Sequence, residues 1–412
     1  MRVVEEETWL TIIASNYLAF ARVLADSLAR VHNRRLRVVI TDAFAPIEDE
    51  PFDVWTMSDI GAPVHWAFQH GRKELAAALK PLALRHALDC GAAATIFIDP
   101  DMLVTGRLDH LVDAVRESPI LLSPHLVRPV PGRQGRRVER EILRAGVFNG
   151  GLIGVSESPE ARRFLAWWQA RIDESCGHDL DDGVHFDQRW LDFVPSLFPT
   201  SRCLRDEGLN VGWWRLVGRR FDVHDGEIFV DGGHCSLLHM SGFRPTAPSV
   251  PCLYYPELLS FDDLGEQAGT VFGAYADACL NAGFVETQFT SGRWSTFDDG
   301  TIIPDAARMI FRQLGDRRML FANPFSSSGS GTFQEWLVEP VDSEQPEVTR
   351  FWLELHDRRP DIQEAYPDPL GVDRRRFVEW IAAWGEPELV RPYLLDDPAF
   401  DDPASDDPGS AR

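Results

Sequence analysis

Short apolar runs alternate with segments of helical periodicity from about residue 9 to residue 155. Runs of Val, Ile, Leu and Phe bounded by polar residues predict strands, and apolar residues that recur every three or four positions predict helices. Strands that alternate with helices are typical of an α/β fold with a mostly parallel, Rossmann-like central sheet flanked by helices. The predicted strands are 8–14, 36–41, 95–98, 120–123 and 152–155, the predicted helices are 18–31, 73–89, 108–117, 159–176 and 187–194, and an arginine-rich loop is predicted over 128–144.

The pattern changes after residue 243. Four prolines fall within twelve residues, at 245, 248, 251 and 256, and mark a domain boundary. Beyond them the pattern predicts a smaller, mainly helical and acidic region, with helices at 262–282, 347–357 and 373–384. The last residues repeat Asp-Asp-Pro three times and predict a solvated, disordered tail. We therefore expect one domain over 1–255, a helical region over 256–395 and a tail over 396–412.

Composition excludes several classes of protein. The 412 residues are 44% hydrophobic and contain no run of about 18 apolar residues, so we expect a soluble, globular chain without a transmembrane segment. The formal net charge of −23 argues against nucleic acid or an anionic membrane as the main partner. Residues 1–250 hold 28 basic and 34 acidic residues, so most of the excess acid lies beyond them. The acidic N-terminus lacks a signal-peptide pattern, and we expect a cytoplasmic protein.

Two scarce residue types narrow the possibilities further. The six cysteines are scattered, with no Cys-x-x-Cys spacing, so neither a zinc site nor a disulfide framework is indicated. Only two of the 41 basic residues are lysines, Lys73 and Lys80. In a chain that otherwise uses arginine, we expect a lysine to have a specific task.

The triplet Asp99-Pro100-Asp101 follows directly on the predicted strand 95–98. Open α/β sheets bind their ligands at the carboxyl ends of the strands. Two carboxylates at i and i+2 can share a hard divalent cation, which in turn neutralises phosphate oxygens. The alternative is a strand-end turn capped by an Asp side chain. The triplet alone leaves both interpretations open.

Further motifs follow in order along the first 250 residues. Together with the Asp99-Pro100-Asp101 strand, they resemble the GT-A-type glycosyltransferases, most closely the retaining family-eight group that includes glycogenin and bacterial galactosyltransferases of lipopolysaccharide synthesis. The elements that carry the resemblance are Asn16-Tyr17 after the first strand, Lys80 on the helix before the Asp99 strand, Phe148-Asn149-Gly150-Gly151, Asp187-Gln188, Leu209-Asn210 and His239-Met240-Ser241-Gly242.

The chain departs from the family after Gly242. The family has a lysine and then Pro-Trp, whereas this chain has Phe243-Arg244-Pro245. Arg244 can replace the lysine as a clamp on a diphosphate, because a guanidinium binds phosphate in a fork, but its register is shifted.

The resemblance implies a metal-dependent glycosyltransferase that moves a sugar, with retention, from a nucleotide-diphosphate sugar to an acceptor hydroxyl. A UDP-sugar is the favoured donor, and the acceptor is a glycan, a natural product or a protein. The implied cofactor is Mn²⁺ or Mg²⁺, held by Asp99, Asp101 and His239. Gln188 and Asp187 are implied as the catalytic residues beside the anomeric carbon. The residues implied in donor binding are Asn16, Tyr17, Lys80, Asp99, Asn149, Gly150, Gly151, Asn210, Gly242 and Arg244.

Each motif also has a structural alternative. His239 can be a buried structural histidine, Asp187 the partner of a helix dipole, and Asn210 a turn former. The Trp-rich segments, 167–168, 190 and 213–214, are interpreted as core packing, with one ring lining a sugar platform as the alternative. The arginine-rich stretch is interpreted as a solvated surface or as a site for an acceptor or a phosphate.

Two other functions share features with a transferase. A nucleotide-sugar hydrolase or a nucleotidyltransferase also has an acidic metal site, but nucleotidyltransferases usually have a glycine-rich basic loop where this chain has Ala14-Ser15-Asn16-Tyr17. A non-catalytic carbohydrate-binding or scaffold protein explains the 13 Trp without a metal. For 256–395, the open roles are packing against the catalytic domain, forming the acceptor side, or forming a homodimer.

Overall fold

The computed structural model describes residues 7–43, 49–130, 132–174, 176–179, 183–290, 292–343, 345–357 and 359–390. The contacts divide these residues into two compact units, the first formed by 7–62 and 73–290 and the second by 63–72 and 291–390. The division falls at residue 290, beyond the proline-rich segment 245–256, because the helices that follow those prolines pack in the first unit. The tail expected over 396–412 lies outside the described residues.

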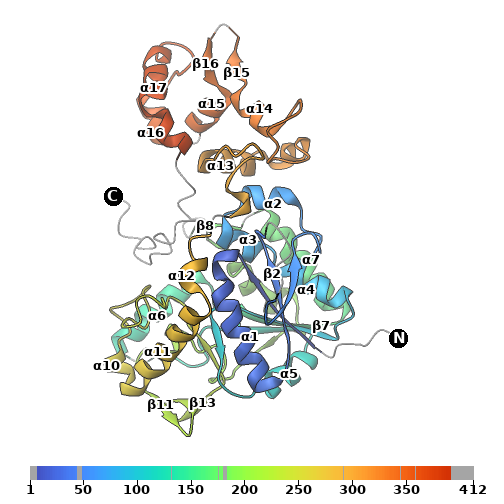
Figure 1. Cartoon of the computed structure of the whole chain (residues 1–412), viewed down its shortest axis with the longest axis vertical. Helices are drawn as coiled ribbons and strands as arrows, with labels where there is room; N and C mark the ends of the chain where they lie inside the picture. Colours follow the sequence, from blue (N-terminus) through green and yellow to red (C-terminus); the bar gives the residue numbers. More distant parts are fainter. Residues whose placement is uncertain are drawn as a thin grey trace. The chain divides into compact units, whose positions relative to one another are not determined.

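A mixed, mostly parallel sheet of seven strands forms the centre of the first unit, as the hydrophobic pattern predicts (Figure 1). Within the sheet, β7 alone runs antiparallel to its neighbours, β4 and β6. The strand order is β10-β6-β7-β4-β1-β2-β3, with bounds Arg202–Cys203, Ile120–Pro124, Phe148–Ser156, Ala94–Ile98, Glu7–Ile13, Leu36–Ile40 and Asp53–Thr56. Because β7 reverses direction, its first residues lie at the edge where the parallel strands β1 and β4 end.

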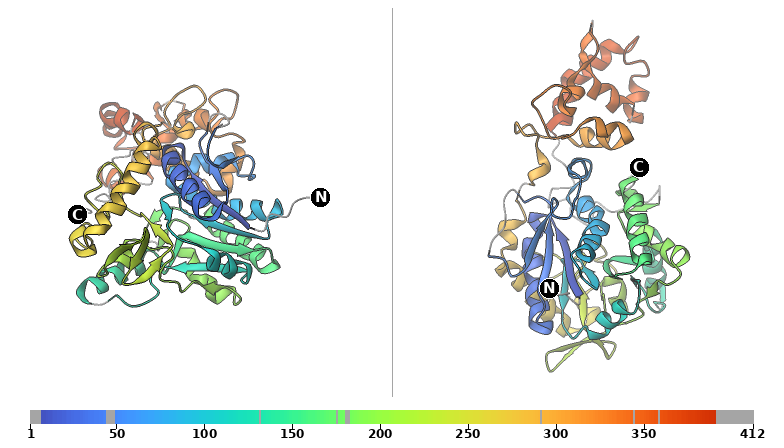
Figure 2. Two further views of the ribbon diagram at one scale, coloured as in Figure 1. Left: turned by 60° about the horizontal axis from the view of Figure 1, so that its bottom comes forward. Right: turned by 90° about the vertical axis from the view of Figure 1, so that its right-hand side faces the viewer.

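Helices cover both faces of this sheet (Figure 2). On one face, α1 (Leu18–His32) and α5 (Asp109–Arg116) pack on alternate residues of β4, such as Ile96 and Ile98. On the other face lies α4 (Lys80–Asp89), which also packs against α7 (Pro159–Glu174). The alternation along β4 therefore sends Phe97 toward α4, where its ring lies under Lys80.

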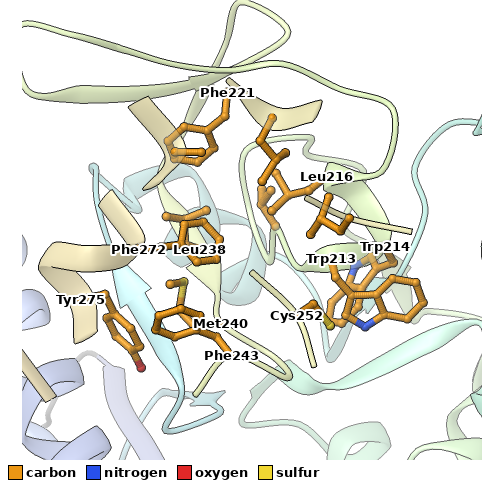
Figure 3. Close-up of a cluster of buried hydrophobic side chains, with 14 of the residues drawn as sticks. Trp213, Trp214, Leu216, Phe221, Leu238, Met240, Phe243, Cys252, Phe272 and Tyr275 are labelled. Carbon is orange, nitrogen blue, oxygen red and sulfur yellow. The ribbon is translucent and has the colours of Figure 1, made fainter. Parts of the chain in front are cut away.

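A second layer of small elements closes the unit beside the sheet. The strand β14 (Leu237–His239) pairs antiparallel with β5 (Met102–Val104), and the strands β11 (Phe221–His224), β12 (Glu227–Val230) and β13 (Gly233–Cys235) form a meander. The long helix α11 (Glu266–Asn281) packs on this layer and on α1. Figure 3 shows Phe272 and Tyr275 of α11 against Leu238, Met240 and Phe243, an apolar cluster that fixes the end of β14.

Three predicted elements differ from those observed. The loop predicted over 128–144 is wrong for most of its length, because Gly132–Ala145 forms the helix α6. Its apolar residues are few, but Val138 and Ile142 are four residues apart and bury one face against the apolar cluster. The predicted helix 73–89 is divided into α3 (Arg72–Ala78) and α4, and the predicted helix 347–357 begins as a strand, β16 (Gln345–Thr349).

The remaining elements of the first unit are short helices and two-residue strands. The strands are β8 (His178–Asp179) and β9 (Val184–His185). The helices are η1 (Ser15–Tyr17), η2 (Arg189–Phe193), α8 (Val194–Leu197), α9 (Trp213–Leu216), α10 (Phe261–Leu264) and α12 (Phe284–Thr287). No helix among the described residues is long and apolar enough to cross a membrane.

The second unit is mainly helical and packs around aromatic rings. Phe68 of α2 (Val64–Gln69) contacts Phe297, Phe311, Phe325 and Phe333. Its elements are α2, η3 (Arg293–Ser295), α13 (Asp305–Gln313), η4 (Gly315–Leu320), α14 (Phe333–Val338), β15 (Pro340–Asp342), β16, α15 (Arg350–His356), α16 (Pro360–Ala365) and α17 (Arg374–Val390). The mainly helical character expected of the C-terminal region is confirmed.

A close contact between α5 and β7 yields a test of the core. A methyl group on Gly154 would lie 2.4 Å from Val115 Cγ2, and Val115 is fully buried. We expect Gly154→Ala to destabilise the first unit by about 1–3 kcal/mol through overpacking. Adding Val115→Ala should recover part of this loss, because it frees the space that the new methyl needs. Thermal unfolding of the single and double variants measures the coupling, and additive losses would contradict it.

Candidate functional site

Three side chains converge at the carboxyl edge of the central sheet. Asp99 follows β4, Asp101 precedes β5, and His239 ends β14. The pairing of His239 with Met102, together with the hydrogen bond from the Met240 N–H to the Asp101 carbonyl (2.9 Å), holds the three in register. His239 Nε2 lies 3.2 Å from Asp101 Oδ1 and 3.9 Å from Asp99 Oδ2, and one ligand atom from each residue lies within 4.8 Å of the others.

Lys80 supplies the cation next to this cluster. Its ammonium is buried and lies 3.1 Å from Asp187 Oδ2 and 3.7 Å from Asp99 Oδ1, and it donates to the carbonyl of Gly150 (3.0 Å). Burial lowers the pKa of Lys80, but the charges of Asp187 and Asp99 outweigh it, so the pKa is raised. Lys80 is therefore a fixed positive charge at the sheet edge.

The carboxylate of Asp101 and the imidazole of His239 each shift the pKa of the other. Burial raises the pKa of Asp101, but the neighbouring His239 outweighs burial and lowers it. The pKa of His239 is raised, because the carboxylates of Asp101 and Asp99 outweigh the lowering effect of its burial. The cluster therefore combines two acidic oxygen ligands with one imidazole, a donor set that suits a divalent cation.

Gly150 and Gly151 bring the backbone of β7 against these charges. A methyl group on Gly151 would lie 2.3 Å from Asp99 Oδ2 and 2.7 Å from Asn149 Oδ1. A methyl group on Gly150 would lie 2.9 Å from Asp187 Oδ2. The absence of side chains at both positions leaves the carboxylates of Asp99 and Asp187 in place.

A buried amide network lies beneath His239. Asn210 Oδ1 lies 2.9 Å from His239 Nδ1, and Asn210 Nδ2 donates to Ser123 Oγ and to Asn149 Oδ1, each at 3.0 Å. Asn210 is 0% exposed and has a left-handed backbone, with φ 56°. With Nδ1 hydrogen-bonded to the amide oxygen, the imidazole is oriented with Nε2 toward the carboxylates.

His125 and Gln188 complete this network. Asn149 Nδ2 lies 3.2 Å from both His125 Nε2 and Gln188 Oε1. Burial lowers the pKa of His125 to about 3, so the ring is neutral. Gln188 Oε1 also accepts from the Gly150 N–H (2.9 Å), and its Nε2 donates to the Ala145 carbonyl (2.9 Å). The side chain of Gln188 thus joins the end of α6 to the start of β7.

Asp187 is the second carboxylate that contacts Lys80, beside Asp99. Burial raises the pKa of Asp187, and the nearby Lys80 offsets this effect only in part. Its backbone carbonyl accepts a hydrogen bond from Trp168 Nε1 (3.0 Å), and its buried Oδ2 faces the Lys80 ammonium at 3.1 Å. A carboxylate has further lone pairs, so it can also accept a hydrogen bond from a ligand hydroxyl.

The structure also places the four remaining predicted residues. Asn16 and Tyr17 form η1 directly after β1, at the same edge as Asp99, because β1 and β4 are parallel neighbours. Asn16 Oδ1 is buried without a hydrogen bond among the described residues. Gly242, with φ 76°, lies on the turn after β14 against Tyr254 and Cys252, and the half-buried Arg244 follows on the same turn.

Three residues near the site were not predicted to belong to it. Ser123 lies near the end of β6 and His125 directly after it, and they bond to Asn210 and Asn149; their position at the end of an apolar strand was the available signal. Lys73, the second lysine of the chain, lies with its ammonium 4.9 Å from the ring centre of Phe186 and contributes to lowering the pKa of Asp101. Both lysines therefore lie at this edge of the sheet.

Comparisons with known proteins give distant similarities. No family model matches the chain. The uncharacterised protein YfnF of Bacillus subtilis (strain 168) is 25% identical over 169 residues, 40% of this chain and 55% of YfnF, and YfnD of the same organism is 26% identical over 154 residues, 33% of this chain and 50% of YfnD. The chain thus spans about half the length of the curated relatives it matches.

The solved structures that it resembles include sugar transferases. The galactosyltransferase LgtC, solved with donor and acceptor sugar analogues, is similar over 66% of this chain and 95% of LgtC, at 13% identity and a TM-score of 0.39. Mouse xyloside xylosyltransferase 1, in its apo form, is similar over 57% of this chain and 97% of its own, at 15% identity and a TM-score of 0.35.

The Gly151 contact predicts a variant that loses metal binding without unfolding. In Gly151→Ala, the new methyl would displace the Asp99 carboxylate, so we expect Mn²⁺ affinity to fall by about tenfold or more. Gly269→Ala in α11 is the matched control, because a methyl group there meets no atom within 4 Å. Electron paramagnetic resonance of free Mn²⁺ gives the affinity, and equal affinities in the two variants would count against the cluster as a metal site.

The amide network predicts that a residue with no exposed surface controls metal affinity. Asn210→Gly keeps the left-handed backbone unstrained but removes the hydrogen bond to His239, so we expect Mn²⁺ affinity to fall roughly 10–100-fold. Ser123→Ala removes only a partner of the Asn210 amide nitrogen and should have a much smaller effect. The same Mn²⁺ titration measures both, and wild-type affinity in Asn210→Gly would show that Asn210 does not position His239.

Proposed function

We propose that the protein is a metal-dependent glycosyltransferase that moves a sugar from a nucleotide-diphosphate sugar, most favourably a UDP-sugar, to an acceptor hydroxyl. The observation that carries this proposal is the convergence of Asp99, Asp101 and His239 beside the buried ammonium of Lys80. These residues would hold a divalent cation at the carboxyl edge of the sheet, where α/β proteins bind ligands.

The residues present fit Mn²⁺ or Mg²⁺. The ligand atoms of Asp99, Asp101 and His239 can all lie within one coordination sphere, and two carboxylates with one imidazole leave further positions for phosphate oxygens. When bound, the cation would stabilise the negative charge that develops on the leaving diphosphate. Asn210 would keep the unprotonated Nε2 of His239 directed at the cation.

The ends of β1 and β14 would hold the nucleotide. The buried, unpartnered Oδ1 of Asn16 supports a hydrogen bond from the N–H of a uracil base, with Tyr17 beside it. Lys80 would contribute fixed positive charge beneath the diphosphate. Arg244, on the turn that Gly242 begins, would clamp the diphosphate from the other side, since a guanidinium can bind two phosphate oxygens at once.

The start of β7 would form the floor under the donor sugar. Gly150 and Gly151 would let the sugar approach the backbone, and the carboxylate of Asp187, beside Lys80, would accept a hydrogen bond from a sugar hydroxyl. The side-chain amides of Asn149 and Asn210 are hydrogen-bonded to each other and to their neighbours, so their contribution is to hold this floor rigid.

Gln188 would face the anomeric carbon from the junction of α6 and β7, with Asp187 beside it. We propose that the configuration is retained by attack on the same face from which the diphosphate leaves, with a diphosphate oxygen accepting the proton of the acceptor hydroxyl. Among the carboxylates of the site, Asp187 is the candidate for a nucleophile, but its Oδ2 lies 3.1 Å from the ammonium of Lys80. Its contribution is therefore electrostatic.

We also propose that the protein acts in the cytoplasm, where nucleotide sugars are made. All six cysteines are free, and Cys176, Cys235, Cys252 and Cys279 are buried. A reducing compartment is consistent with this state.

A donor screen tests the proposal. We expect released nucleoside diphosphate from one of the UDP-, GDP- or TDP-sugars in the presence of Mn²⁺, and a loss of at least about 100-fold in Asp101→Asn, because the carboxylate ligand is gone. Asp26→Asn, on the exposed side of α1, is the matched control and should retain wild-type turnover.

The same screen separates the rival functions. Metal-dependent release of diphosphate that yields only free sugar, whatever acceptor is added, would indicate a nucleotide-sugar hydrolase. Calorimetry that shows no metal-dependent binding of any nucleotide would reject the transferase and favour a carbohydrate-binding protein. An NMR spectrum of the product with the inverted anomer would reject retention alone.

A further inference from the structure

The helix α6 carries an arginine stripe, which we define as Arg133, Arg136, Arg137, Arg140 and Arg144. At about 100° per residue, these five positions cover an arc of only about 100° on the helix. Gly135, Val138 and Ile142 lie on the opposite side and are buried. The stripe is therefore one continuous face of the helix, about 16 Å long at about 1.5 Å per residue.

Most of this positive charge is not neutralised. Arg137 pairs with Glu257, and Arg144 pairs with Glu141 at 3.3 Å. Arg133, Arg136 and Arg140 are exposed and make no ion pair with a described residue. In a chain with 64 acidic and 41 basic residues, an exposed helix face that serves only for solubility would be expected to contain more acid.

At its first turn the helix carries positive charge against its own stability, whereas Arg144 in the last turn complements the dipole. Its first turn contains Arg133 and no acidic residue, although the positive end of the helix dipole lies there. A positive charge at this end opposes the dipole and costs a few tenths of a kcal/mol to about 1 kcal/mol. Residues that weaken local structure in this way are expected where they serve recognition.

The stripe ends at the proposed transfer site. Ala145, directly after Arg144, accepts the hydrogen bond from Gln188 Nε2 at 2.9 Å. Gly146 and Val147 then lead into β7 and to Asn149 at the floor of the site. A molecule that reaches the anomeric carbon beside Gln188 can therefore continue along the exposed face of α6.

We propose that the arginine stripe binds the acceptor, and that the acceptor is a soluble, linear molecule with repeated phosphate groups. This proposal rests on the proposed transferase function. The arginines recur every three or four residues, about one helical turn or 5 Å apart, which matches a chain with regularly spaced anions. Guanidinium groups bind phosphate oxygens in a two-pronged geometry.

A membrane surface fits the stripe less well. The apolar side chains Val138 and Ile142 are directed into the protein core, so α6 has no free apolar face to insert into a bilayer. Leu143 is the one large apolar side chain of the helix that is exposed. The net charge of −23 also opposes adsorption to a flat anionic surface, whereas a narrow chain meets only the local positive charge.

The test measures binding of a synthetic six-unit glycerol-phosphate oligomer by calorimetry, with maltohexaose as the neutral probe. We expect the full-length protein to bind the oligomer and not maltohexaose. In the triple variant Arg133→Gln, Arg136→Gln, Arg140→Gln, we expect the Kd to rise by about tenfold or more, as the loss of three charged contacts implies. The matched control, Arg30→Gln, Arg163→Gln, Arg205→Gln, removes the same charge from exposed positions elsewhere in the unit and should bind as the wild type does.

Two further measurements fix the interpretation. Titration with UDP and Mn²⁺ should give the same affinity in both triple variants and in the wild type. If the protein does not bind the nucleotide at all, the proposed function fails, while the oligomer titration still reports on the stripe. Absence of oligomer binding, or equal affinity in the α6 variant, would overturn the assignment of the stripe. Binding to phosphatidylglycerol vesicles but not to the oligomer would also overturn it, in favour of a membrane surface.

Discussion

The site depends on keeping three carboxylates together at one edge of a sheet. Asp99, Asp101 and Asp187 would repel one another strongly, since two like charges 4 Å apart cost about 4 kcal/mol at an effective dielectric constant of 20. Lys80 lies between Asp187 and Asp99, and His239 lies between Asp99 and Asp101. Each carboxylate therefore has a basic side chain within 3.7 Å. Lys80 and His239 come from different layers, so the site exists only when α4 packs on β4 and β14 pairs with β5.

The packing of those layers explains elements that carry no chemistry themselves. β14 is only three residues long, and its position is fixed by pairing with β5 and by the apolar contacts of Phe243 with Phe272 and Tyr275. The helix α11 therefore holds His239 in place from a distance in the sequence. This dependence also accounts for the position of the unit boundary at residue 290, because a domain that ended at 255 would lack the helix that covers β14.

The sequence predicts an element or a site well where one residue type or one hydrophobic period is enough to define it. The apolar runs predicted the strands at 8–14 and 95–98, and the resemblance to a known family implied the grouping of Asp99 and Asp101 with the distant His239 that the structure brings together. The helix α6 could not be predicted in the same way, because two apolar residues, Val138 and Ile142, bury its inner face and the rest reads as polar. The roles of Ser123 and His125 depend on hydrogen bonds to Asn210 and Asn149, residues tens of positions away, and no local pattern records such contacts.

The reversed direction of β7 has a consequence for how the fold can change. β6 and β7 are antiparallel neighbours, so the segment between them leaves the sheet and returns to it at the same edge. Topologically this segment, 125–147, is a long hairpin connection that contains α6, and neither of its ends has to cross the sheet. The exposed residues of α6 can therefore vary without altering the register of any strand, whereas His125, Ala145 and the buried Val138 and Ile142 are tied to the amide network or to the core. A graft of the exposed face of α6 from a relative would exchange the surface next to the site while leaving the rest of the sheet as it is.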